Sequence, residues 1–230
     1  AVFFILFAIN IYLGFQDESL PEKMMYSDDY EGYPFLLYTP VDYETNPYKK
    51  WPLIVYLHGA SLRGTDTNLL KKYGLPDLIE RGEQFDFIVA SPQCPPGKTW
   101  INDDWFPPFY NNLTDKYRID TTRIYLTGMS MGGFGTWYIG AKYPEYFAAI
   151  APLCGGGNPD DASKYKDVAV WVIHGTNDKT VPIERSEEMV NALKSINQKV
   201  RFTRLKGQGH EIQDFYEKKE LYRWFLKANK

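Results

Sequence analysis

The sequence of 230 residues is poor in the residue types and patterns that bind metal ions or phosphate groups. It contains two cysteines and three histidines, and its cysteines lack the spacing of a metal site. A phosphate-binding glycine loop, a basic cluster and an internal repeat are also missing. The net charge of −3 provides no attraction to nucleic acid or to an anionic membrane surface. We therefore expect no bound metal ion and no nucleic-acid partner.

The composition is that of an ordinary globular domain, with 44% hydrophobic and 24% charged residues. A chain of 230 residues buries a substantial core and is short enough to form a single domain. Composition does not fix the oligomeric state, which stays open.

Residues 1–15 carry no charge and are nearly all apolar. Such a segment is typical of the hydrophobic part of a secretory signal peptide, and it is short for a full membrane span. A truncated membrane anchor and a buried N-terminal strand are the alternatives. We predict a signal-peptide remnant over residues 1–16 and one folded domain over residues 17–230. The mature protein is then secreted or periplasmic, without a stable attachment to a membrane.

Strand-like and helix-like segments alternate after residue 50, which predicts an α/β fold with a mostly parallel central sheet and helices on both faces. The connection over residues 154–167 is too short for an inserted cap domain. Strands are predicted at 33–39, 52–58, 86–91, 122–128, 147–153, 168–174 and 199–205. Helices are predicted at 67–81, 131–143, 182–196 and 212–228, with a further short helix within 107–118.

Residues 128–132 read GMSMG, a G-x-S-x-G pattern between a strand-like and a helix-like segment. A serine hydroxyl is a weak nucleophile that must stand clear of its sheet and have a base beside it. A sharp turn from strand to helix exposes Ser130 in this way, and side chains at Gly128 and Gly132 would collide in so tight a turn. We predict that Ser130 is a catalytic nucleophile. The alternative is a glycine-rich turn with a buried serine.

The sequence offers three histidines as candidates for the general base. Nucleophiles on such a turn are followed along the chain first by the acid and then by the histidine, and only His174 and His210 follow Ser130. His210 lies in a polar, glycine-containing loop before the last predicted helix, and we predict that it is the base. His58 and His174 end apolar strands, and we interpret them as residues that fix local turns.

The predicted acid is Asp178, in the loop that follows the strand at 168–174. Its role is to accept the Nδ1–H of His210 and to hold the imidazole in the correct tautomer. Asp160, Asp161 and Asp167 are rival acids, but they precede that strand instead of following it. A turn aspartate or a helix cap is the structural alternative for Asp178.

Two backbone N–H groups are predicted to stabilise an oxyanion. The first belongs to Met131, at the positive end of the helix behind Ser130. The second comes from the loop after the strand that ends at His58, where Ala60 is our first choice and Ser61 the alternative.

The segment 100–110 is rich in aromatic residues and contains two prolines, which predicts a loop. Trp100 and Trp105 are our candidates for a substrate-binding wall beside the site. A packing loop is the equally weighted alternative.

Cys94 and Cys154 follow strands that two other strands would separate in this topology. A disulfide needs Cα atoms within about 7 Å of each other, and neighbouring strands are about 4.8 Å apart. We therefore expect free thiols.

Together, PLIVYLHG at 52–59, GMSMGGFGTW at 128–137, HGTND at 174–178 and the Gly209-His210 pair resemble the motifs of α/β-hydrolases. More narrowly, the chain is similar to secreted esterases of the feruloyl-esterase, polyhydroxybutyrate-depolymerase-like and dienelactone-hydrolase-like groups. Dienelactone hydrolases proper use cysteine where this chain has Ser130. The resemblance implies an α/β-hydrolase fold without a cap domain, a Ser130–His210–Asp178 triad, no cofactor, and hydrolysis through an acyl-enzyme.

The leading hypothesis is a serine carboxylesterase that acts on small-molecule or polysaccharide-linked esters, with feruloyl and acetyl groups as the candidate acids. The first alternative is a serine peptidase similar to the catalytic domain of prolyl oligopeptidases. The second is a hydrolase-like module that only binds its ligand. Neither the acid nor the alcohol of the substrate is fixed by the sequence.

Overall fold

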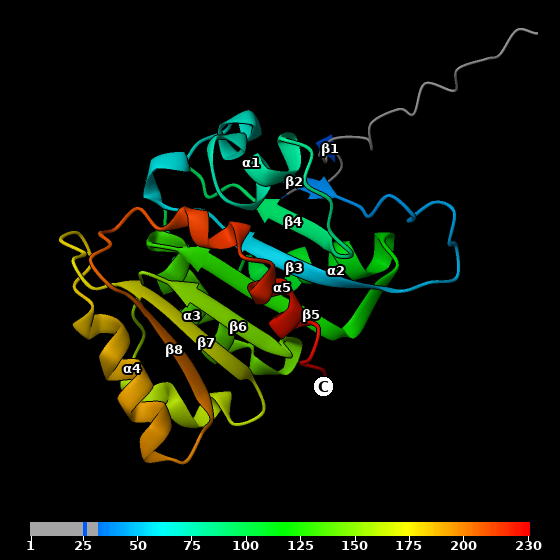
Figure 1. Ribbon diagram of the computed structural model, residues 1–230. Helices are drawn as coiled ribbons and strands as arrows, with labels where there is room; N and C mark the ends of the chain where they lie inside the picture. Colours follow the sequence, from blue (N-terminus) through cyan, green and yellow to red (C-terminus); the bar gives the residue numbers. More distant parts are fainter. Residues whose placement is uncertain (1–24, 27–31) are drawn as a thin grey trace, which may run out of the picture.

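The computed structural model describes Met25–Tyr26 and residues 32–230 (Figure 1). The predicted signal-peptide remnant over residues 1–16 lies outside the described residues. Within the described part, no helix is both long enough and apolar enough to cross a membrane.

An eight-stranded sheet with the order β1-β2-β4-β3-β5-β6-β7-β8 forms the centre of the molecule. Strands β3 to β8 run parallel to one another, whereas β1 and β2 are antiparallel additions at one edge. The strands span Met25–Tyr26, Phe35–Tyr38, Trp51–Leu57, Ile88–Pro92, Ile119–Met129, Ala149–Leu153, Ala169–Gly175 and Val200–Leu205. The mostly parallel sheet predicted from the alternation of strand-like and helix-like segments is confirmed. Strands β2 to β8 correspond to the seven predicted strands.

Helices cover both faces of the sheet because its strands are apolar on both sides. Along β3, Leu53, Val55 and Leu57 pack in the core beneath α2 (Phe106–Lys116), α3 (Met131–Lys142) and α4 (Glu184–Ser195). Ile54 and Tyr56 point the other way, into the core beneath α1 (Leu75–Glu80) and α5 (Lys219–Phe225). Figure 1 shows α5, in red, in front of the strands and α3 behind them.

Two predicted helices are shorter and broken in the structure. The segment 67–81 divides at Gly74, whose φ of 75° favours glycine and where a Cβ atom would overlap the hydroxyl of Tyr56. The segment 212–228 divides at Lys218, which has extended backbone between a 3-10 helix and α5. Apolar periodicity runs through both breaks, so the pattern alone does not reveal them.

Helix α2 confirms the short helix predicted within 107–118, but it begins at Phe106, inside the segment 100–110 that we predicted to be a loop. Pro107 and Pro108 occupy its first turn, where a missing backbone N–H costs no intrahelical hydrogen bond. The prolines therefore mark the start of a helix and not its exclusion. The connection between β6 and β7 holds only a 3-10 helix, Pro159–Tyr165, and no cap domain.

Both cysteines are free and buried, as expected, with β3 and β5 between the strands that they follow. Burial raises the pKa of the Cys94 thiol to about 11 and that of Cys154 still further. Since the thiolate is the reactive form, we expect both thiols of the folded protein to resist iodoacetamide at pH 7.5. Mass spectrometry should find both alkylated only after denaturation in urea. Rapid labelling of the folded protein would contradict this placement.

Candidate active site

Ser130 sits at the tip of a strained turn between β5 and α3. Its φ of 59° and ψ of −119° lie in a region that residues with side chains rarely adopt. The turn is fixed on both sides, because Ser130 N–H donates to the carbonyl of Leu153 at 2.9 Å and Phe134 N–H donates to the carbonyl of Ser130 at 3.0 Å. Strain of this kind persists where the surroundings impose it, which is common at functional sites.

Backbone crowding explains the glycines on either side of the turn. Leu57 pairs with Gly128 in the sheet, so β3 passes directly beside the turn. A Cβ atom on Gly128 would lie 2.5 Å from the carbonyl oxygen of Leu57, and one on Gly132 would overlap the same oxygen. As predicted, the turn has no room for a side chain at Gly128 or Gly132.

The structure brings together the three residues of the predicted triad. His210 Nε2 lies 2.9 Å from Ser130 Oγ, and His210 Nδ1 lies 2.7 Å from Asp178 Oδ2. The three residues follow β5, β7 and β8, whose carboxyl ends lie at one edge of the parallel sheet. This arrangement lets a proton leave the serine hydroxyl for an imidazole that the carboxylate orients.

The carboxylate of Asp178 is buried and held by hydrogen bonds. Its Oδ1 accepts the backbone N–H groups of Thr180 and Val181, both at 2.8 Å. Burial raises the pKa of this carboxyl, but the hydrogen bonds from His210, Val181 and Thr180 outweigh burial and hold the pKa below its usual value. Asp178 is therefore ionised at neutral pH, as a residue that stabilises an imidazolium must be.

His58 is buried at the end of β3 and serves the local turn, as we interpreted it. Its Nε2 accepts the backbone N–H of Cys94 at 2.9 Å, and its Nδ1 lies 2.6 Å from the carbonyl oxygen of Gly59. Burial lowers its pKa to about 4, so the ring is neutral at neutral pH. His174 differs from our interpretation, because its ring also faces the carboxylate of Asp178. The spacing of four residues between them was the available signal.

The two predicted oxyanion donors flank the serine. Met131 is the first residue of α3, and the first turn of a helix has N–H groups without an intrahelical acceptor. Ala60 begins a 3-10 helix, Ala60–Leu62, and lines the same cavity as Ser130. Their role in binding an oxyanion stays a prediction.

A cavity of about 240 Å³ opens beside Ser130 and His210. Tyr73 stands on its wall, with the hydroxyl 2.6 Å from Ser61 Oγ. The other lining residues are Tyr56, Gly59, Ala60, Met129, Glu211 and Gln213. The space beside the nucleophile is small and partly polar.

The structure corrects the prediction that Trp100 and Trp105 bind substrate. Trp100 is fully buried and Trp105 is 6% exposed, and neither residue lines the cavity beside Ser130. The indole N–H of Trp100 donates to the carbonyl of His58, and that of Trp105 donates to the carbonyl of Trp100. The two rings pack in the core, with Trp105 stacked on Tyr33. The alternative of an aromatic packing segment is therefore correct.

Comparison with known proteins gives one family and several relatives. The family model described as Phospholipase/Carboxylesterase matches residues 110–219. A solved thermostable esterase is 32% identical with a TM-score of 0.77, and the match covers 92% of this chain and 64% of that one. The chain has the α/β-hydrolase fold. The chain is also 32% identical to a bifunctional acetylxylan esterase/xylanase of Neocallimastix patriciarum, over 59% of this chain and 20% of that protein.

A third relative is poly(3-hydroxyalkanoate) depolymerase C of Paucimonas lemoignei. It is 31% identical over 46% of this chain and 28% of the depolymerase. The chain thus spans only a fifth to about two thirds of the length of these relatives. The resemblance to esterases expected from the motifs is confirmed.

Proposed function

We propose that this chain is a serine carboxylesterase with Ser130 as nucleophile, His210 as general base and Asp178 as the orienting acid. The observation that carries the proposal is a chain of two hydrogen-bond contacts that starts at the strained Ser130. Ser130 Oγ lies 2.9 Å from His210 Nε2, and His210 Nδ1 lies 2.7 Å from Asp178 Oδ2. A purely structural serine would not require the strained turn at Ser130, and a histidine that only caps a helix would not require a contact with the buried carboxylate of Asp178.

The geometry supports a two-step reaction. His210 Nε2 takes the hydroxyl proton as Ser130 Oγ forms a bond to the ester carbonyl carbon, and the N–H groups of Met131 and Ala60 hold the oxyanion. The bond to the alcohol oxygen then breaks, and His210 returns the proton to that oxygen. Water attacks the acyl-enzyme with the same proton route and releases the acid.

We further propose that the acyl group is short, with acetyl esters of small molecules or polysaccharides as the substrate class. Two observations support a short acid over feruloyl. The cavity measures only about 240 Å³, and the aromatic side chains expected to stack on an aryl acid are in the core. The absence of a cap between β6 and β7 leaves room for an alcohol displayed on a polymer.

Initial rates on p-nitrophenyl acetate, butyrate and octanoate, on methyl ferulate and on a prolyl-peptide anilide test this proposal. We expect kcat/KM for the acetate to exceed that for the octanoate by about tenfold or more, because a small pocket excludes the longer chain. A preference for methyl ferulate would overturn the short-acyl assignment. Anilide cleavage without ester hydrolysis would instead favour the peptidase alternative.

A further inference from the structure

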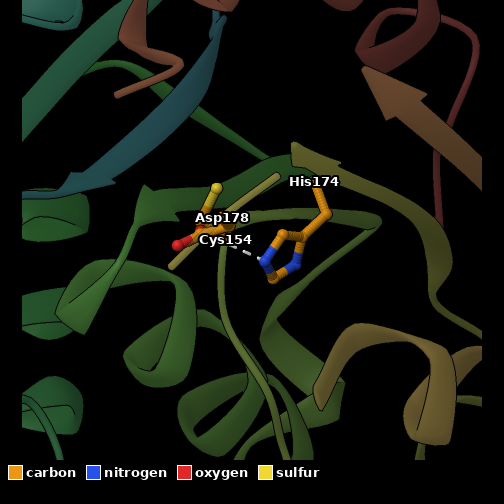
Figure 2. Close-up of side chains that lie close together, drawn as sticks. All are labelled: Cys154, His174 and Asp178. Atoms are coloured by element: carbon orange, nitrogen blue, oxygen red, sulfur yellow. Dashed lines mark ion pairs between the residues drawn. The ribbon is translucent and has the colours of Figure 1, made fainter. Parts of the chain in front are cut away.

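A buried cluster lies behind the carboxylate of Asp178, on the side away from solvent. Cys154, His174 and Asp178 bring a sulfur, an imidazole and a carboxylate within 4.8 Å of one another. Figure 2 shows the ring of His174 facing Asp178, with the side chain of Cys154 close to both. The three residues have the chemistry of metal ligands, but the protein itself already uses their polar atoms.

Every polar atom of His174 has a protein partner. Nε2 lies 2.9 Å from the carbonyl oxygen of Val181 and 3.3 Å from Asp178 Oδ2. Nδ1 lies 2.7 Å from Ser186 Oγ, which contacts the carbonyl oxygen of Gly155 at 2.8 Å. A metal ion would have to break these hydrogen bonds, so we interpret the cluster as a hydrogen-bonded network.

The partners fix the proton of His174 on Nε2. The carbonyl of Val181 and the ionised carboxylate of Asp178 only accept hydrogen bonds, so the nitrogen that faces them must donate. The hydroxyl of Ser186 has one hydrogen, which points either to Gly155 or to Nδ1. In both cases Nε2 carries a proton, which donates to the carbonyl oxygen of Val181 at 2.9 Å and lies 3.3 Å from Asp178 Oδ2.

We propose that His174 is a positioning residue for the catalytic acid, an inference that rests on the proposed function. Asp178 Oδ2 is held between two imidazoles, His210 on the side of the nucleophile and His174 on the buried side. Because Nε2–H also holds Val181, whose own N–H binds Oδ1, His174 fixes both the carboxylate and the loop that carries it. Through Ser186, it joins that loop to the first turn of α4.

Cys154 also acts on this carboxylate, because its protonated thiol hydrogen-bonds to Asp178 and helps to lower the pKa of that carboxyl. A thiol is a weaker donor than an imidazole N–H, and this one also lies 3.6 Å from the carbonyl oxygen of His210. If His174 lost its Nε2–H, the carboxylate could turn away from His210, and small misalignments in an active site cost up to about 100-fold in rate.

Two substitutions of similar size separate positioning from packing. The amide of His174→Gln can place an N–H near the Nε2 position, whereas the amide of His174→Asn reaches only as far as Nδ1. For p-nitrophenyl acetate hydrolysis we expect His174→Asn to lower kcat by about tenfold or more with little change in KM, and His174→Gln to stay within about threefold of the unmodified protein. Equal losses in the two variants would overturn the proposal.

A double-mutant cycle tests whether the effect passes through the acid. In an Asp178→Asn background the carboxylate is gone, so adding His174→Asn should change kcat by less than about twofold. An undiminished tenfold loss in that background would mean a general structural role. Thermal unfolding of each variant, with the buried His58→Gln as a matched reference for stability alone, ensures that rates are compared between folded proteins.

A measurement on the unmodified protein keeps the proposal testable even if His174→Asn does not fold. NMR of the protein labelled with ¹⁵N-histidine should find a proton on His174 Nε2 that exchanges slowly with solvent. An unprotonated Nε2 would overturn the inference and leave the proposed function intact. Failure of the proposed function looks different, because Ser130→Ala would then hydrolyse esters as fast as the unmodified protein.

Discussion

Ser130→Ala is expected to lower kcat for ester hydrolysis by a factor on the order of 10³ or more. The substitution removes the oxygen that forms the acyl-enzyme and leaves His210 and Asp178 in place. Residual activity would come from the oxyanion donors and from binding alone, which supply only part of the rate acceleration. Initial rates with p-nitrophenyl acetate measure the loss directly.

Two controls make this result specific. Ser91→Ala removes the hydroxyl of a buried serine in β4, outside the cavity, and should retain the rate of the unmodified protein. A fluorophosphonate probe should label the unmodified protein at Ser130 and fail to label Ser130→Ala. Near-normal turnover in Ser130→Ala, or labelling at another residue, would remove Ser130 from the mechanism.

The meeting of the three residues of the predicted triad was predictable because each follows a strand with a strong apolar pattern. Parallel strands end at a common edge, so any polar loop residues that follow them meet there. The order of residues along the chain then selected His210 over His174 and Asp178 over the acids that precede β7. The glycines at 128 and 132 were predictable for the same kind of reason, since a tight turn limits side-chain size.

Side-chain direction was not predictable in the same way. Trp100 and Trp105 lie among prolines and polar residues, a context typical of exposed loops. The rings nevertheless turn inward, because indole N–H groups find carbonyl acceptors at His58 and at Trp100 itself. Whether an aromatic residue in a loop faces the core or the solvent depends on such distant partners, which local composition does not contain.

The second imidazole on Asp178 illustrates a limit of residue-by-residue assignment. His174 ends a buried strand, so a structural role was the natural interpretation. That interpretation was incomplete because β7 and the following turn bring residues four apart back toward each other, which strand periodicity does not describe. The distance of 3.3 Å between His174 Nε2 and Asp178 Oδ2 shows that this strand-end histidine also contacts the predicted catalytic acid.

Gly132→Ala is expected to destabilise the protein by about 4 kcal/mol or more, or to prevent folding. The added methyl group would overlap the carbonyl oxygen of Leu57 and lie 3.0 Å from that of His58. The first is a backbone atom of the last residue of β3 and the second belongs to the residue that follows it, so neither can move without disturbing this central strand. Urea unfolding followed by tryptophan fluorescence measures the loss.

Gly140→Ala is the matched control, because it makes the same change in the same helix, α3. A Cβ atom there would meet Ile150 Cδ1 and Tyr165 Cε1 at 3.3 Å and Ile150 Cγ2 at 3.4 Å, which are side-chain contacts that shifts of a few tenths of an ångström relieve. Alanine also favours the helix by about 1 kcal/mol over glycine, so the two effects should nearly cancel. If Gly132→Ala were as stable as Gly140→Ala, the close approach of α3 to β3 that exposes Ser130 would be wrong.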